Sequence, residues 1–186
     1  MIEFPLYEAD TAPEASRAHL EALTRTFGFL PNHPKILAES PAALRAYRAL
    51  NEILSESTFT AIERNALLIA ISVEHRCDYC VSAHTTLLRM AQGPDQVIQG
   101  LRARKSTGDA RIDALARFAR TMVEKRGWAD DADVHAFLDA GFTREQVLEV
   151  VAALSLKTLT NYANHLAETP LDDIFAADRW SPSEAF

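Results

Sequence analysis

The sequence predicts an all-α protein, and three observations support this fold class. Strand-like alternation of apolar and polar residues is almost absent, whereas apolar residues recur at helical spacing along most of the 186 residues. Two segments open with the capping-box pattern that starts helices. Glycines and prolines divide the periodic segments at intervals typical of helices. We therefore expect a single domain over residues 1–186, with its core between about residues 20 and 170.

The expected helices follow from these signals in chain order. A glycine closes the first helix, and the two prolines of FLPNHP predict a loop over residues 29–34. Thr60 with Glu63 opens one helix through a capping box, and a second box at Thr143 opens the last long helix. The helices are expected over residues 13–27, 41–54, 60–75, 77–91, 94–104, 110–126, 130–140 and 144–167.

Apolar patterning assigns a place to several of these helices. The helix that begins at Thr60 has a wide apolar face, so we expect it to be central and mostly buried. We expect Trp180 and Phe186 in the tail to pack on a partner.

Two stretches, starting at TAIERNALL and TREQVLEVV, share a capping box, a long apolar helix and a later histidine, which predicts a helical pseudo-repeat. The last long helix is expected to bury Val147, Val150, Val151, Leu154 and Thr158.

Charge and hydropathy exclude several classes of function. The formal net charge is −7 without a Lys/Arg cluster, so neither nucleic acid nor an anionic membrane is an expected partner. The N-terminus MIEFPLYEADTAPE has no basic start and no apolar run, and therefore does not resemble a signal peptide. No apolar stretch approaches the roughly 20 residues of a membrane helix. We expect a soluble, cytoplasmic protein.

The segment CDYCVSAH contains both cysteines of the chain. If a helix begins near Cys77, then Cys77, Cys80 and His84 share one face at positions i, i+3 and i+7. A helix N-terminus favours thiolate, which by itself would make Cys77 the more acidic thiol. A thiolate attacks a peroxide to form a sulfenic acid, and a second thiol condenses with it to a disulfide.

Other interpretations of this group remain open. Glu74, three residues before Cys77, could extend a proton relay from His84 if it faces the cluster. The cysteines could instead be buried and unreactive, or they could bind zinc with His84 and a fourth ligand such as His165. His19, His33 and His135 have the pattern of surface or loop residues.

The run ExxCxxCxxxH, from Glu74 to His84, resembles the motif of the AhpD-like alkylhydroperoxidases within the carboxymuconolactone decarboxylase family. FGFLPN at 27–32 and TNYANHLAETPLD at 160–172 resemble a peroxidase-related branch of that family. The resemblance implies an AhpD-like helical bundle with thiol peroxidase activity and homo-oligomers, usually trimers or hexamers. It also implies that Cys80 attacks the peroxide, Cys77 resolves, and His84 and Glu74 relay the proton.

This chain departs from AhpD itself at two positions. Tyr79 stands between the cysteines, where AhpD has a histidine, and Asn65 stands where the relay glutamate is expected. Glu74 would then have to supply the relay carboxylate. Members of the family that decarboxylate lactones lack the cysteine pair, so that activity is not expected here.

The leading hypothesis is a peroxidase that reduces organic hydroperoxides through a Cys77–Cys80 disulfide. An external thiol, from a thioredoxin-like protein, a lipoyl protein or a small thiol, would restore it, and no cofactor is expected. The alternatives are a disulfide reductase or redox partner, a non-catalytic binding protein with a Cys/His metal site, and a decarboxylase or isomerase that uses His84 as a base.

Overall fold

The computed structural model describes residues 3–186, and no β-strand occurs in that range. This confirms the predicted all-α fold class. Within the same range, no helix is long and apolar enough to cross a membrane. The helices are α1 (Glu14–Phe27), α2 (Asn32–Leu37), α3 (Pro41–Ser55), α4 (Ala61–Glu74), α5 (Asp78–Met90), α6 (Asp95–Arg102), α7 (Ala110–Glu124), α8 (Asp131–Asp139) and α9 (Arg144–Ala167), followed by the 3₁₀ segments η1 (Asp173–Asp178) and η2 (Pro182–Glu184).

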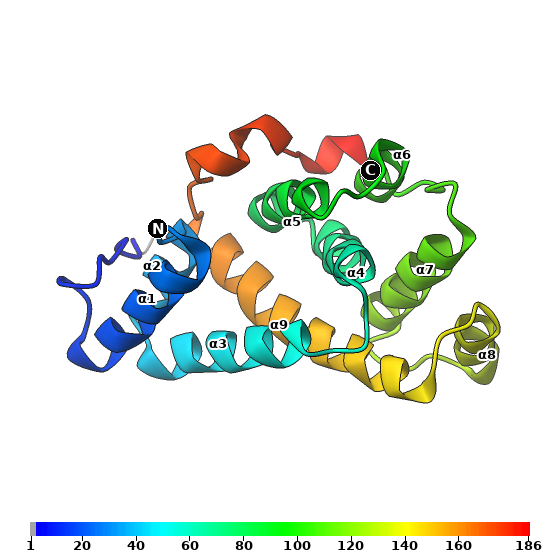
Figure 1. Ribbon diagram of the computed structural model, residues 1–186, viewed down its shortest axis with the longest axis horizontal. Coiled ribbons are helices and arrows are strands. Elements are labelled where there is room, and N and C mark those ends of the chain that lie inside the picture. Colours follow the sequence, from blue (N-terminus) through cyan, green and yellow to red (C-terminus); the bar gives the residue numbers. More distant parts are fainter. Residues whose placement is uncertain (1–2) are drawn as a thin grey trace.

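Helix α4 lies at the centre of the molecule, and α5, α6, α7 and α9 pack around it (Figure 1). Its capping box is formed as predicted, with the Thr60 hydroxyl and the Glu63 carboxylate each accepting a backbone N–H. Every residue from Asn65 to Val73 is buried. The prediction that this helix is central and mostly buried is therefore confirmed, because the middle of α4 is buried on all sides.

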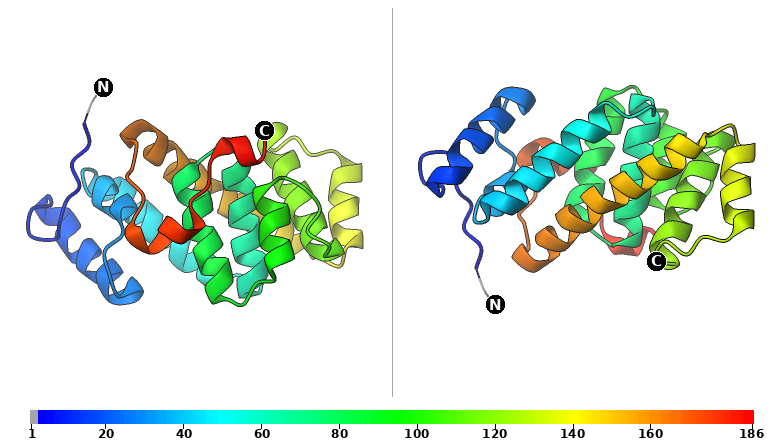
Figure 2. Two further views of the ribbon diagram at one scale, coloured as in Figure 1. Left: turned by 90° about the horizontal axis from the view of Figure 1, so that it is seen from above. Right: turned by 90° about the horizontal axis from the view of Figure 1, so that it is seen from below.

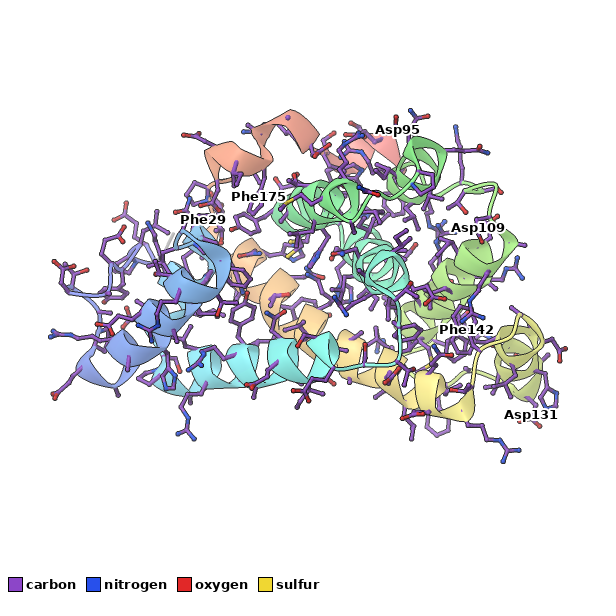
Figure 3. All side chains as sticks on the ribbon, viewed as in Figure 1. Phe29, Asp95, Asp109, Asp131, Phe142 and Phe175 are labelled. Atoms are coloured by element: carbon purple, nitrogen blue, oxygen red, sulfur yellow. The ribbon has the colours of Figure 1, made fainter. Side chains whose placement is uncertain are left out.

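Helices α3 and α9 run side by side along one face, with α1 and α2 at one end and α7 and α8 at the other (Figure 2). The C-terminal segment returns across α5, and η1 packs directly on that helix. Phe29, before α2, and Phe175, in η1, meet edge to face with ring centroids 6.2 Å apart (Figure 3). The N-terminal and C-terminal parts of the chain thus come together beside the helix that carries the cysteines.

The predicted loop over residues 29–34 is only partly correct. Asn32 begins α2, and Pro31 precedes it in an extended conformation. Pro34 then falls in the first turn, where the N–H that proline lacks has no partner within the helix. His33 is therefore a helical residue, and it is 5% exposed, so its assignment to the surface is wrong.

Other expectations about burial also need correction. Val151 is 42% exposed, and Thr158 is exposed as well, because both lie on the outer side of α9. Trp180 is buried within this chain and donates its indole N–H to the Arg102 carbonyl at 3.1 Å. Phe186 lies half-exposed under the guanidinium of Arg76. The described structure therefore gives both tail aromatics partners inside the chain.

Candidate active site

A sharp turn between α4 and α5 presents the two cysteines. Helix α4 ends at Glu74, and Arg76 takes up the left-handed conformation with a φ of 58°. The Cys77 N–H then donates to the Ser72 carbonyl at 3.0 Å, which closes the end of α4. Cys77 becomes the N-cap of α5, and Cys80 lies in its first turn, where the helix N-terminus is partly positive.

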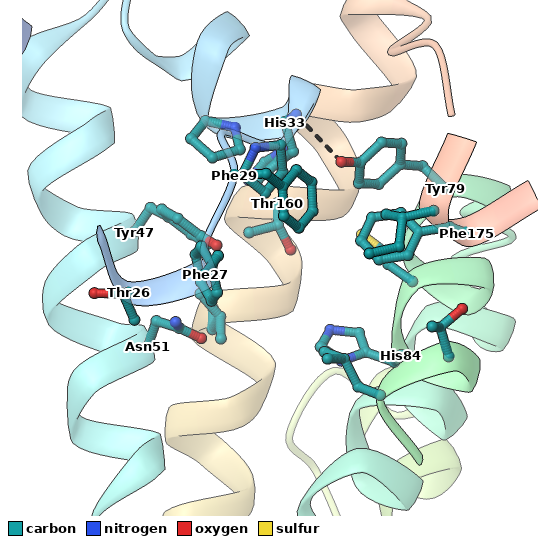
Figure 4. Close-up of a pocket in the computed structure, with 18 of the residues that line it drawn as sticks. Thr26, Phe27, Phe29, His33, Tyr47, Asn51, Tyr79, His84, Thr160 and Phe175 are labelled. Carbon is teal, nitrogen blue, oxygen red and sulfur yellow. Dashed lines mark hydrogen bonds between the residues drawn. The ribbon is translucent and has the colours of Figure 1, made fainter. Parts of the chain in front are cut away.

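The two thiols differ in their access to the main cavity of the described chain. Both are free and buried, with Cys77 at 0% and Cys80 at 4% exposure. Cys80 lines a cavity of about 310 Å³, the pocket drawn in Figure 4, whereas Cys77 is not among the residues that line it. A molecule in this cavity would therefore meet Cys80 first. The apolar part of the wall includes Phe27, Phe29, Leu87, Met90, Leu156 and Phe175.

Lys157 of α9 brings a positive charge to the same cavity. The residue is 2% exposed, and its Nζ donates to His84 Nε2 at 3.1 Å. No Asp or Glu between residues 3 and 186 forms an ion pair with it. Because an isolated buried charge is very costly, a counter-charge is needed nearby. The Cys80 thiolate is the group at this cavity that can supply it.

The environment separates the two cysteines in acidity. Burial by itself raises the pKa of Cys80, but the hydrogen bond from Cys77 and the charge of Lys157 outweigh it, so the pKa lies well below its usual range. The same hydrogen bond, together with burial, raises the pKa of Cys77. These opposite directions support Cys80 as the thiolate and Cys77 as the thiol. The charge at the helix N-terminus, which alone would favour Cys77, is not decisive here.

His84 lines the cavity, but its hydrogen bonds go to groups other than the cysteines. Its Nδ1 is 3.3 Å from the Asn65 Oδ1, and its Nε2 faces the Lys157 ammonium. Burial and the nearby charge of Lys157 hold the pKa of His84 well below its usual range, so the ring is neutral. Its proton must lie on Nδ1, because Nε2 accepts from Lys157. His84 thus orients Lys157 at the cavity.

The expected pairing of Glu74 with His84 is wrong. The Glu74 carboxylate is 2.8 Å from the Arg104 Nε and 3.4 Å from the Arg120 Nε. Its side chain is 5% exposed, so these guanidinium groups from the far side of α4 provide the neutralisation that a buried carboxylate requires. Asn65, at the position where the resemblance implies a glutamate, contacts His84 instead.

Tyr79, between the two cysteines, connects three parts of the chain. Its hydroxyl donates to the Asp172 Oδ2 at 2.6 Å and accepts the backbone N–H of His33 at 3.3 Å, the bond drawn in Figure 4. Asp172 also accepts the backbone N–H of Asn32 at 3.1 Å. The phenol therefore ties α5 to α2 and to the C-terminal segment, and no hydrogen bond joins it to either sulfur.

Asn164, near the end of α9, contacts both sulfur atoms and was missed in the sequence. Its Nδ2 lies 3.3 Å from the Cys80 Sγ and 3.9 Å from the Cys77 Sγ. Its Oδ1 lies 2.8 Å from the His33 Nδ1 and 2.7 Å from the Thr169 Oγ1. The sequence does contain a signal for this residue. Lys157 and Asn164 are polar, yet their helical spacing places both on the buried face of α9, and buried polar residues often belong to a site.

The geometry does not favour a Cys/His metal site. In the part of the chain that the structure describes, no three His, Cys, Asp or Glu side chains are grouped as metal ligands. Both nitrogens of His84 already have partners, and one partner is an ammonium group that would repel a cation. The expected set of Cys77, Cys80 and His84 therefore lacks the features of a zinc centre.

The fold and the cysteine site are those of a helical thiol protein, and comparisons with known proteins show which family it resembles. Residues 41–121 match the model of the carboxymuconolactone decarboxylase family. No curated protein matches the sequence. A peroxidase-related protein with an alkylhydroperoxidase AhpD core, from Ralstonia eutropha JMP134, is 26% identical with a TM-score of 0.80, covering 93% of each chain.

Two further solved structures share the fold. A peroxidase-related protein from Silicibacter sp. TM1040 is 22% identical with a TM-score of 0.79, covering 94% of this chain and 92% of that one. A cysteine-to-alanine variant of the debrominase Bmp8, in complex with 2,3,4-tribromopyrrole, is 16% identical with a TM-score of 0.78, covering 96% and 95%. The family match over residues 41–121 and the similarity to the AhpD-core structure both support the AhpD-like assignment that the ExxCxxCxxxH motif predicts.

Proposed function

We propose that this protein is a thiol peroxidase that reduces organic hydroperoxides through Cys80 and Cys77. One observation carries the proposal: the buried Lys157 ammonium has no carboxylate partner in the described chain and shares its cavity with Cys80. This arrangement stabilises a thiolate at the floor of a mostly apolar cavity. A thiolate in contact with an apolar compartment suits a nucleophile for a neutral organic peroxide.

The proposed reaction has two steps. The Cys80 thiolate attacks the terminal oxygen of ROOH and the O–O bond breaks, leaving a sulfenic acid on Cys80 and an alkoxide. Lys157 donates a proton to the alkoxide, which departs as the alcohol ROH. The Cys77 thiol then condenses with the sulfenic acid, which releases water and forms the disulfide. An external thiol, from a thioredoxin-like protein, a lipoyl protein or a small thiol, reduces the disulfide.

The proposal extends to assembly and compartment. Helix α9 exposes several large apolar side chains on its outer side, which suits an interface in a homo-oligomer such as a trimer or hexamer. A cytoplasmic setting would supply the thiol reductant. The exposed residues of this face are Leu148, Val151, Tyr162 and Leu166.

The competing class is a protein disulfide reductase or redox partner. Both cysteines are almost fully buried, and Cys80 is reached through a cavity of about 310 Å³, a size that suits a small molecule. Peroxide specificity also has to be distinguished from other reductive chemistry, because the structurally similar Bmp8 is a debrominase. The rate with cumene hydroperoxide should therefore exceed the rates with a protein disulfide and with 2,3,4-tribromopyrrole.

Mass spectrometry of the thiols tests the proposal directly. One equivalent of cumene hydroperoxide should convert the wild type to a single intramolecular disulfide. Cys77→Ser should trap a sulfenic acid on Cys80, while Cys80→Ser should leave Cys77 unmodified. Sulfenic acid on Cys77 would reverse the roles of the two residues. Two free thiols under excess peroxide would overturn the peroxidase proposal.

A further inference from the structure

The amide of Asn164 lies between the cysteine pair and two hydrogen-bond donors from other segments. Its Nδ2 faces the Cys80 sulfur at 3.3 Å, and its Oδ1 faces the His33 Nδ1 at 2.8 Å and the Thr169 Oγ1 at 2.7 Å. We propose that His33 and Thr169 are positioning residues that fix this amide, so that its Nδ2 donates to the Cys80 thiolate. The inference rests on the proposed function and assigns that site two further residues.

The hydrogen bonds permit one orientation of the amide. A carbonyl oxygen has two lone pairs, and here His33 and Thr169 each supply one donor to them. A flipped amide would turn its NH₂ group towards these donors and its oxygen lone pairs towards a thiolate. Both changes are unfavourable, because each leaves buried polar groups without suitable partners.

His33 suits this role because its ring offers a single directed donor. Burial lowers the pKa of His33, so the ring is neutral and carries one proton. That proton lies on Nδ1, which faces the Asn164 oxygen, while the buried Nε2 has no hydrogen-bond partner. Thr169 follows the end of α9 and is also buried. The two donors thus come from opposite ends of the chain.

A second asparagine on the same helix provides a matched control. Asn161 lies one turn before Asn164, is 0% exposed, and contacts the Nδ1 of His75 at 2.9 Å. Its Nδ2 faces the Ser72 hydroxyl at 3.4 Å, and no hydrogen bond joins it to a sulfur. Asn161→Asp therefore places the same new carboxylate in a comparable buried position without removing a donor from Cys80.

The experiment measures the acidity of Cys80 in a Cys77→Ser background, where it is the remaining thiol. Ultraviolet absorbance reports the thiolate between about pH 4 and 9. Asn164→Asp should move the midpoint upward by at least about one pH unit, because it removes a hydrogen bond to a charged group. Thr169→Val should move it upward by less, and Asn161→Asp should leave it in place. The titratable groups that interact with Cys80 remain unchanged in all three variants: Lys157, His33, His75, Tyr47 and Tyr79.

The outcomes separate this inference from the proposed function. An unchanged midpoint in Asn164→Asp or Thr169→Val, with a low midpoint in the parent, would overturn the inference alone. Equal shifts in Asn164→Asp and Asn161→Asp would also overturn it, since they would indicate a general effect of added charge. If the predicted shifts occur but peroxide oxidises neither cysteine in the wild type, the amide contact stands and the peroxidase proposal fails. Thr169→Val keeps the test decisive if Asn164→Asp does not fold.

Discussion

The Lys157 ammonium donates to the His84 Nε2 at 3.1 Å inside an apolar cavity, and no carboxylate of the described chain pairs with it. His84 is kept neutral by burial and by that charge. The histidine therefore acts as an acceptor that aims the lysine, and the lysine charge supports the thiolate of Cys80. The buried charge and the reactive sulfur stabilise each other.

Replacing Lys157 should make the reaction with peroxide depend strongly on pH. In Lys157→Met the pKa of Cys80 rises, so less thiolate is present at low pH and more forms as the pH increases. We expect at least about a tenfold lower rate of thiol oxidation near pH 6, with recovery towards pH 9. Stopped-flow rates with cumene hydroperoxide measure this. Lys125→Met, which removes an exposed lysine paired with Asp130, is the control and should match the wild type.

Glu74→Gln should lower stability and leave the thiol chemistry intact. The substitution leaves the Arg104 and Arg120 guanidinium groups without their buried carboxylate, which we expect to cost about 1–3 kcal/mol, given that Arg104 is partly exposed. Thermal unfolding and rates of peroxide oxidation, measured on the same samples, separate the two effects. If the folded variant oxidised at least tenfold more slowly with peroxide, Glu74 would have to be a member of the proton relay after all.

Tyr79→Phe should weaken the packing of the C-terminal segment with little effect on Cys80. The lost hydroxyl leaves Asp172 with one donor fewer, for a cost of about 1–2 kcal/mol in the free energy of unfolding. The oxidation rate should stay within about twofold of the wild type, because no hydrogen bond joins the phenol to a sulfur. Urea unfolding and stopped-flow rates test this, with the exposed Tyr162→Phe as the control. A large loss of rate without loss of stability would contradict this assignment.

Acid should destabilise the protein through its buried histidines. The folded-state pKa values of His33 and His84 lie below the unfolded value near 6.5, so below that pH the unfolded chain binds more protons. Stability is therefore full above about pH 6.5 and falls as the pH drops towards the folded-state pKa values, by up to about 1.4 kcal/mol per pH unit for each histidine. Urea midpoints at pH 7.5 and about 5.5 measure the loss.

His84→Gln should reduce this acid-induced loss, whereas His135→Gln, at an exposed position, should leave it unchanged. An identical loss in His84→Gln and the wild type would show that His84 does not titrate as its burial requires.

The fold was largely predictable, because its signals are local. Capping boxes at Thr60 and Thr143 and the left-handed Gly28 mark helix ends through contacts within a few residues, and each is formed in the structure. The error at 29–34 came from treating Pro34 as a helix breaker, although the first turn of a helix tolerates proline. The outward-facing Val151 shows that an apolar residue alone does not define the buried face of a helix.

The site was only partly predictable, because its chemistry is assembled from distant segments. The motif identified Cys77, Cys80 and His84, which one helix and its N-cap place together. Lys157 and Asn164 come from α9, and no local spacing connects them with the cysteines. The prediction for Glu74 failed because helix α4 ends at this residue, so helical periodicity does not determine where its side chain points. The side chain instead turns towards Arg104 and Arg120, which are distant in the sequence.

The unpaired buried charge of Lys157 also bears on the reduction potential of the site. In the reduced protein, ammonium and thiolate sum to zero, whereas a disulfide would leave the ammonium alone in the cavity. Because an isolated buried charge is unfavourable, Lys157 should favour the reduced state, in which the thiolate balances it, over the disulfide. The reduction potential of the cysteine pair should therefore be higher in the wild type than in Lys157→Met. An unchanged potential in Lys157→Met would show that the lysine does not discriminate between the two redox states. The charge that activates Cys80 towards an oxidant would thus also make the disulfide easier for an external thiol to reduce.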